Sequence, residues 1–258
     1  NAILGTNERI FFLKRSFFCA NLLTRAVFLL KIERTFDFVL ENVMSSTTSL
    51  TASDEQQAQS PVRKGEQTRM AILDIALEVA ARDGMEGVTI GILADRLSMS
   101  KSGVFSHFGS REDLLIATLK EYENRFLTEV LKPVVTLPRG LTRLKAILGN
   151  WFNRLNAETD SGCLYISGAV EYDDRPGAVR DELVGMITAW EKELSKAIRQ
   201  SIETQELIED TPVDLVTFEI YGLALAFHQH NRLMRRPNGS AMVRQVFERI
   251  LNQYQRVA

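Results

Sequence analysis

The stretch TIGILADRLSMSKSGVFSHFGSREDLL, residues 89–115, decides the fold that this sequence predicts. Its first apolar residues, Ile90, Leu93, Ala94 and Leu97, fall at i, i+3, i+4 and i+7. On a helix this spacing places them on one face. We therefore expect a short helix that packs inward.

A second short helix is expected after a break at residues 98–99. Ser100 is placed to cap this helix, and Val104 and Phe108, four residues apart, lie on one buried face. The opposite side carries Lys101 and small polar residues. Two short helices joined by a tight turn predict a helix-turn-helix.

The charge of this segment suits contact with nucleic acid. No acidic residue occurs from Arg96 through Arg111, and with Lys101 the window carries a formal charge of +3. A helix with this charge and small outward side chains can approach phosphates and enter a major groove. The alternative from pattern alone is an ordinary helical bundle, because such bundles also contain short amphipathic helices.

A longer match favours the first interpretation. From Thr68 to Leu115 the sequence resembles the DNA-binding domain of the tetracycline-repressor (TetR) family of bacterial transcription regulators. The matching residues are Thr68, Arg69, Ile72, Leu73, Ala76, Gly84, Thr89, Ile92, Ala94, Leu97, Ser100, Lys101, His107, Phe108, Ser110, Arg111 and Glu112. The chain departs from the family at Phe105, usually Tyr, and at Ser102, often Gly.

The resemblance implies a set of DNA-contacting residues. It assigns phosphate contacts to Thr89, Lys101, His107 and Arg111, with Ser100 capping the recognition helix. It assigns base contacts to Ser102, Gly103, Phe105 and Ser106, and Lys101 could serve in either role. Because Phe105 replaces a tyrosine, any phosphate contact from a tyrosine hydroxyl is missing here.

The amino-acid composition limits the classes of protein to which the chain can belong. The chain has 258 residues, 45% hydrophobic and 25% charged, which is typical of a globular protein large enough for two domains. A net charge of −2 argues against binding nucleic acid over the whole surface. The two cysteines, Cys19 and Cys163, give no disulfide framework and no metal cluster, which fits a cytoplasmic protein.

The first 62 residues are interpreted as a disordered or non-native extension. The sequence starts at Asn1, and its first methionine is Met44, which we expect to be the natural start. Charges scattered through residues 10–30 disfavour a membrane span and a secretory signal. A peripheral helix is the alternative for this part. Residues 44–61, rich in Ser, Thr and Gln, predict a flexible arm.

Apolar periodicity predicts an all-α chain of two domains. Residues 63–109 form a three-helix DNA-binding domain that begins with a helix over 66–83. Residues 110–258 form a larger helical domain for ligand binding and dimerisation. Its expected helices cover 110–130, 141–155, 163–170, about 176–204 and 213–227, followed by a last helix capped by Ser240.

The larger domain is expected to dimerise and to hold an effector. The helix over 213–227 is apolar nearly all round, so its hairpin with the last helix predicts a homodimer on a near-palindromic DNA site. The family resemblance implies a pocket for a small molecule, mostly apolar or aromatic. We predict its lining as Trp151, Tyr165, Met186, Trp190 and Tyr221. The alternative is that these side chains are simply core.

Catalysis is disfavoured. His107 lies in the recognition helix, His228 and His230 lie near a helix end, and none sits in a known catalytic motif. We therefore expect no cofactor, no metal and no enzymatic activity. The chain is predicted to be a DNA-binding transcription regulator, a repressor released by a small molecule. The alternatives are a helical module that binds protein instead of DNA, and a small helical enzyme.

Overall fold

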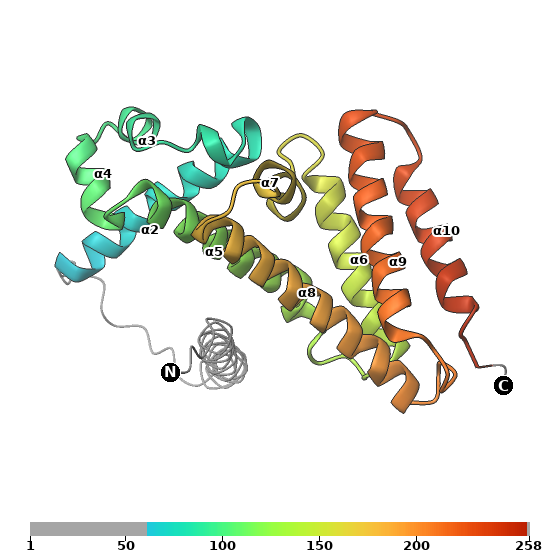
Figure 1. The fold of residues 1–258 in the computed structure, drawn as a ribbon. Coiled ribbons are helices and arrows are strands. Elements are labelled where there is room, and N and C mark those ends of the chain that lie inside the picture. The colour runs from blue at the N-terminus through green and yellow to red at the C-terminus, as the bar shows by residue number, and fades with distance from the viewer. Residues whose placement is uncertain (1–60, 257–258) are drawn as a thin grey trace, which may run out of the picture. The chain divides into compact units, whose positions relative to one another are not determined.

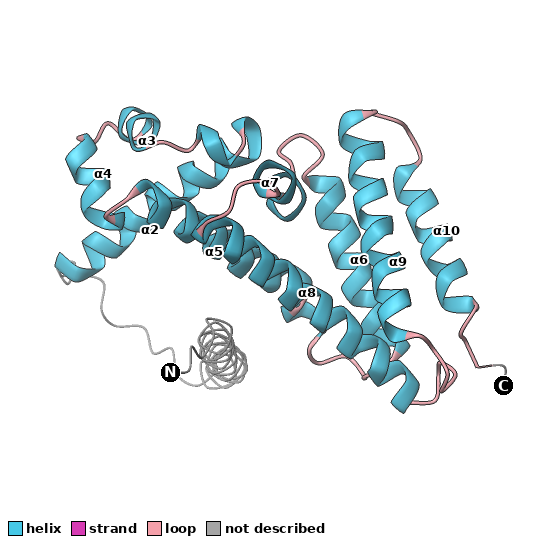
Figure 2. Cartoon of the chain, in the orientation of Figure 1, coloured by secondary structure: helices cyan, strands magenta, loops and turns pink. Residues whose placement is uncertain are grey.

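The computed structural model describes residues 61–256, which are helical apart from turns, loops and one isolated antiparallel bridge between Leu207 and Gln255 (Figures 1 and 2). The predicted all-α class is confirmed. The elements are α2 (Pro61–Asp83), η1 (Met85–Gly87), α3 (Ile90–Arg96), α4 (Lys101–Phe108), α5 (Arg111–Val130), η2 (Lys132–Val134), α6 (Leu141–Ala157), α7 (Leu164–Tyr172), α8 (Ala178–Glu203), α9 (Val213–His228), η3 (Gln229–Leu233) and α10 (Gly239–Asn252).

The helix-turn-helix forms where residues 89–115 predict it. Helices α3 and α4 each begin after an N-cap whose side-chain oxygen accepts a backbone N–H. Thr89 Oγ1 accepts from Ile92 at 3.2 Å, and Ser100 Oγ accepts from Gly103 at 3.0 Å. Ser98, in the turn between them, has a left-handed φ of 53°. This turn and the two caps set where α4 begins.

The described chain has two halves, the helix-turn-helix domain before residue 110 and the larger helical domain after it. Helix α5 is buried in both halves. Its N-cap, Ser110, accepts the N–H of Asp113 at 3.0 Å, as the sequence predicts. Along its length the buried residues are Leu114, Leu115, Thr118, Leu119, Tyr122, Phe126 and Val130. The first part of α5 packs against α2 and α4, and the helix also contacts α6 and α8. The expected boundary at residue 110 therefore falls at the start of a shared helix.

The larger half is a bundle in which α6, α9 and α10 run side by side, with α8 packed against α5, α6, α7 and α9 (Figure 1). Buried apolar side chains fill the space between these helices, among them Leu144 and Leu148 of α6 and Leu194 and Ile198 of α8. One buried polar contact joins α8 to α9, where the hydroxyls of Ser195 and Thr217 lie 2.9 Å apart.

A carboxylate joins the two halves. Glu171, near the end of α7, accepts the backbone N–H of Met85 at 2.8 Å and that of Glu86 at 2.7 Å. Met85 is fully buried, and the Tyr172 hydroxyl donates to Glu86 at 2.8 Å. Because η1 lies between α2 and α3, these bonds fix the helix-turn-helix to the end of α7. We call this contact the η1–α7 joint.

Three sequence-based details are wrong. Helix α2 begins at Pro61 and not at residue 66, and α8 begins at Ala178, after Gly177, and not at Pro176. Ser240 does not cap the last helix. The N-cap is Asn238, which takes a left-handed φ of 70°, and the Ser240 hydroxyl donates instead to Asn156 Oδ1 at 3.2 Å.

Some expectations lie outside the described residues. The proposed start at Met44 and the flexible arm fall within residues 1–60, which the structure does not describe. Within residues 61–256, no helix is long and apolar enough to cross a membrane.

Candidate functional site

The outward face of α4 is formed by four exposed residues: Lys101, Ser102, Phe105 and Ser106. Their spacing, i, i+1, i+4 and i+5, gathers them on one side of the helix. On the opposite side Val104 is fully buried against the domain core. Helix α4 is therefore anchored by its inner face and presents the residues that the sequence predicts for DNA contact.

Lys101 lies beside the N-terminus of α3. A Cβ added at Gly91 would be 3.7 Å from Lys101 Cε, 3.9 Å from Lys101 Nζ and 3.9 Å from Thr89 Oγ1. Gly91 thus leaves room for the lysine side chain near the Thr89 hydroxyl. The Lys101 ammonium and the Thr89 hydroxyl thus both lie near Gly91, and groups of these two kinds contact phosphate in DNA complexes.

The serine hydroxyls of α4 already have partners within the helix. Ser106 Oγ donates to the carbonyl of Gly103 at 2.7 Å, and the hydroxyls of Ser100 and Ser102 lie 3.1 Å apart. The oxygens of Ser102 and Ser106 can each accept a further hydrogen bond, whereas Ser100 Oγ already accepts the N–H of Gly103. His107 is half-buried, with its ring centroid 6.4 Å from that of Phe108.

Arg111 is engaged differently from what the sequence predicts. Its guanidinium donates to the carbonyl of Val88 at 3.1 Å, to the carbonyl of Glu86 at 3.0 Å and to Glu86 Oε2 at 3.1 Å. Arg96 pairs with Glu78 at 2.9 Å. Two of the three positive charges counted in the window are therefore committed to acidic residues elsewhere in the domain. Among the described residues, no ion pair involves the third, Lys101.

The five residues predicted to line an effector pocket are brought into one region. Trp151, Trp190 and Tyr221 form ring contacts, with centroids 5.0 Å apart for the two tryptophans and 6.0 Å for Trp151 and Tyr221. Phe126 of α5 joins them, 4.8 Å from Trp190 and 4.8 Å from Tyr165. We call these five rings the aromatic cluster. Met186, also predicted, is buried on α8 one turn before Trp190.

Two donors in the aromatic cluster lack acceptors. The indole N–H groups of Trp151 and Trp190 are buried and have no hydrogen-bond partner in the described part of the chain. An unpaired buried donor costs about 1–3 kcal/mol. Buried tryptophans usually find a partner, so this pair marks where an acceptor atom would be stabilised.

A polar group of residues borders the aromatic cluster. The Tyr122 hydroxyl lies 3.1 Å from both carboxylate oxygens of Glu158 and 3.2 Å from Cys163 Sγ. Arg154 pairs with Glu158 at 2.9 Å, and its guanidinium lies 5.0 Å from the centre of the Tyr122 ring. Burial raises the pKa of Glu158 even though Arg154 opposes the rise, and burial raises the pKa of Cys163 to about 12.

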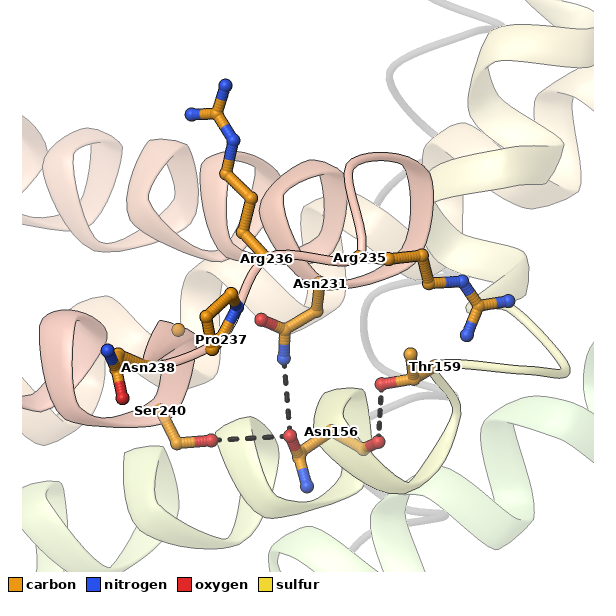
Figure 3. A pocket seen from close by; sticks show the side chains of 9 residues that line it. Asn156, Thr159, Asn231, Arg235, Arg236, Pro237, Asn238 and Ser240 are labelled. Carbon is orange, nitrogen blue, oxygen red and sulfur yellow. Dashed lines mark hydrogen bonds between the residues drawn. The ribbon is translucent and has the colours of Figure 1, made fainter.

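A pocket of about 340 Å³ lies apart from the predicted lining (Figure 3). It is bordered by Asn156 and Thr159 and by residues 231 and 235–240. Asn156 Oδ1 accepts from both Asn231 and Ser240 at 3.2 Å. The guanidinium groups of Arg235 and Arg236 point away from these amides (Figure 3). The predicted effector residues do not line this pocket, since they pack against one another.

Two protein-family models match the chain, one in each half. The model described as bacterial regulatory proteins of the tetR family matches residues 72–118, which contain the helix-turn-helix. The tetracyclin repressor-like C-terminal domain matches residues 140–247. The chain belongs to the TetR family of transcriptional regulators. The family resemblance stated from residues 68–115 is thereby confirmed and extends over the larger domain.

The chain is 18–21% identical to each of three relatives. The fatty acid metabolism regulator protein of Bacillus subtilis (strain 168) is 21% identical over 153 residues, covering 59% of this chain and 77% of that protein. A TetR regulator structure from Chloroflexus aurantiacus J-10-FL has a TM-score of 0.69 at 18% identity, over 76% of this chain and all of that one. The structure of the regulator FadR from B. subtilis in complex with stearoyl-CoA has a TM-score of 0.60 at 19% identity, over 70% and 97%. These structures share the fold.

Sequence reasoning missed the residues that link the two halves. Glu171 and Glu86 are charged residues at helix ends, and the partners that link η1 to α7 lie 85 or 86 residues apart in the chain, so no local pattern marks them. The buried pair of Arg154 and Glu158 had a weak indication, because residues four apart share a helix face. In the described residues, no group of three or more His, Cys, Asp or Glu side chains is placed to hold a metal ion.

Proposed function

We propose that this TetR-family regulator is a homodimeric, sequence-specific DNA-binding repressor that a small apolar molecule releases from its operator. The observation that carries the proposal is the outward face of α4, which is capped, anchored by Val104 and free of acidic side chains. A surface of this kind fits a major groove. We place its action in the cytoplasm, where it meets DNA.

In this proposal the DNA contacts divide by chemistry. Lys101 and Thr89 hold a phosphate beside the N-terminus of α3, with His107 near a second phosphate. Ser102, Gly103, Phe105 and Ser106 face the base edges. Arg111, which the sequence assigned to phosphate, acts mainly by fixing residues 86–88.

The first experiment selects duplexes from a random DNA pool with the purified protein and then measures affinity against salt concentration. Lys101→Ala should reduce the slope of log affinity against log salt by about 0.9 per subunit, because one phosphate contact is lost. Arg111→Ala, the matched control, should leave the slope near the wild-type value. Equal slopes for wild type and Lys101→Ala would refute the phosphate assignment. Failure to enrich any duplex would refute DNA recognition itself.

Dimerisation is proposed through α9 and α10. Leu215, Phe218 and Leu225 of α9 are 50%, 75% and 41% exposed and, with Gly222, follow one stripe along the helix. Met242, on the neighbouring helix α10, is 52% exposed. A symmetric pairing of two such hairpins would cover these side chains as a four-helix bundle. The two recognition helices would then lie about 34–36 Å apart on a near-palindromic site.

Phe218→Glu should convert the dimer to a monomer, since it places a charge at the centre of the apolar stripe. Sedimentation velocity at micromolar concentration should show the wild type as a dimer and the variant at half its mass. Val170→Glu is the control, because Val170 is 71% exposed on α7 and lies outside the stripe. A monomeric wild type, or an unchanged dimer in Phe218→Glu, would contradict this interface.

The effector site is proposed at the aromatic cluster. An apolar molecule that separates these rings and presents an acceptor oxygen to the indole N–H of Trp151 or Trp190 would satisfy a donor that is now unpaired. A fatty acyl thioester has this chemistry, with an apolar chain and a carbonyl. The FadR structure with stearoyl-CoA makes acyl-CoA thioesters the first probes to use.

Release requires a path from the aromatic cluster to α4. Tyr165, near the start of α7, belongs to the aromatic cluster, and Glu171, about 9 Å further along the helix, holds η1. Phe126 of α5 lies in the same cluster. An effector that binds better when α5 and α7 are displaced would shift the spacing of the recognition helices and weaken DNA binding.

The test measures acyl-CoA binding by calorimetry and its effect on DNA affinity, with chain lengths from four to eighteen carbons, in wild type and Trp190→Phe. Phenylalanine keeps an aromatic ring but removes the indole donor, so effector affinity should fall about tenfold. DNA affinity without effector should stay within twofold. Unchanged effector affinity in Trp190→Phe and in Trp151→Phe would place the site elsewhere. If no acyl-CoA binds, this effector class is wrong while DNA recognition stands.

A further inference from the structure

The outward face of α4 is unusual in what it can offer to a base pair. Of its four exposed residues, two are serines, one is a lysine and one is phenylalanine. Residues 101–108 contain no Arg, Asn, Gln, Asp or Glu. Together with lysine, which occurs once on this helix as Lys101, these are the side chains that make the bidentate or accepting contacts by which proteins usually distinguish G, A and C in the major groove. Hydrogen-bonded readout from this helix is therefore sparse.

The hydroxyls add little to that readout. The Ser106 proton is donated to the Gly103 carbonyl, and the hydroxyls of Ser102 and Ser100 are paired with each other. Lys101 lies beside Gly91 at the start of α3, where the proposed function assigns it to a phosphate. One proton of the Ser100–Ser102 pair stays free to donate, and Ser106 can still accept, but a single donor or acceptor on a hydroxyl does not identify a base pair.

Phe105 remains as the large group on this face. It is 50% exposed, while Val104 beside it in sequence is fully buried, so the ring faces outward from an anchored helix. It lies four residues after Lys101, one turn further along the same face. In the major groove the one apolar feature of a base pair is the 5-methyl group of thymine, which phenylalanine contacts favourably.

We propose that Phe105 reads the 5-methyl group of a thymine in each half of the DNA site, and that this apolar contact is the main source of base preference. The inference rests on the proposed DNA-binding function and specifies its chemistry. It explains how a helix with few base-reading side chains can still discriminate. It also gives a role to the phenylalanine that stands where the family usually has tyrosine.

The test uses duplexes enriched from a random pool, resynthesised with 2′-deoxyuridine in place of thymidine at one position at a time. Deoxyuridine keeps the pairing and the O4 acceptor and removes only the methyl group. For wild type, one thymine in each half-site should be sensitive, with affinity falling roughly fourfold per half-site and about fifteenfold for both together. Affinities are measured at low salt, where phosphate contacts keep weaker variants bound.

Three variants identify the side chain responsible. Phe105→Ala should bind the thymine and uracil duplexes equally, whereas Phe105→Tyr, which keeps the ring, should retain the difference. Ile92→Ala is the matched control, because Ile92 is a 39% exposed apolar residue on α3, and it too should retain the difference. Thermal unfolding of each variant checks its fold.

The outcomes separate the two proposals. Failure to enrich any duplex would refute DNA recognition and with it this inference. Enrichment without a thymine whose methyl group matters in wild type would leave DNA recognition standing and overturn the role of Phe105. A methyl dependence that persists undiminished in Phe105→Ala would also overturn it. Loss of the methyl dependence in Phe105→Ala alone is the result that the proposal expects.

Discussion

The structure depends on one constraint, that α5 must be buried in both halves of the protein at once. Leu114, Leu115 and Leu119 complete the core beneath the helix-turn-helix, while Tyr122 and Phe126 enter the core of the larger bundle. Each of these side chains is at most 5% exposed. A helix committed in this way cannot move for one half without disturbing the other. The short helices α3 and α4, too small to be stable alone, take their orientation from it.

The η1–α7 joint adds a second connection of different chemistry. Where α5 contributes apolar packing, the Glu171 carboxylate accepts two hydrogen bonds from backbone N–H groups. Such bonds to a charged acceptor are stronger than bonds between neutral groups. Glu86 gathers Arg111, Arg175 and Tyr172 around its own carboxylate. The hydrogen bond from Tyr172, together with Arg111, lowers the pKa of Glu86 despite some opposing burial. These contacts therefore favour the ionised form of Glu86.

Local sequence patterns located the helices and two of their caps, but not every helix start. Ser100 and Ser110 were identified as N-caps because a small polar residue before an apolar repeat has a defined backbone role. Asn238 was missed in favour of Ser240, since a left-handed residue before a helix depends on the loop that precedes it. The aromatic residues were correctly grouped, because they recur on inward helix faces. The orphaned indole donors and the Glu171 contact depend on tertiary packing between residues far apart in sequence, which no spacing rule reveals.

Arg111 shows why residues that contact DNA are harder to predict from sequence than helices are. The family resemblance assigns it a phosphate contact, and within the folded chain its guanidinium donates to Glu86 and to two backbone carbonyls. A charged side chain counts toward a surface only after its partners within the fold are known. By the same reasoning, Lys101 and Phe105 are the large groups that α4 presents outward. In the proposal Lys101 holds a phosphate and Phe105 provides the base preference.

The most direct test of the account is whether the two halves unfold together. Both tryptophans of the chain, Trp151 and Trp190, lie in the aromatic cluster, so their fluorescence reports the larger bundle, whereas far-UV circular dichroism reports all the helices. Urea unfolding followed by both signals should give one transition with the same midpoint, because α5 and the η1–α7 joint couple the halves. Loss of helical signal at lower urea, with tryptophan emission unchanged, would show that the helix-turn-helix unfolds independently and would contradict the account.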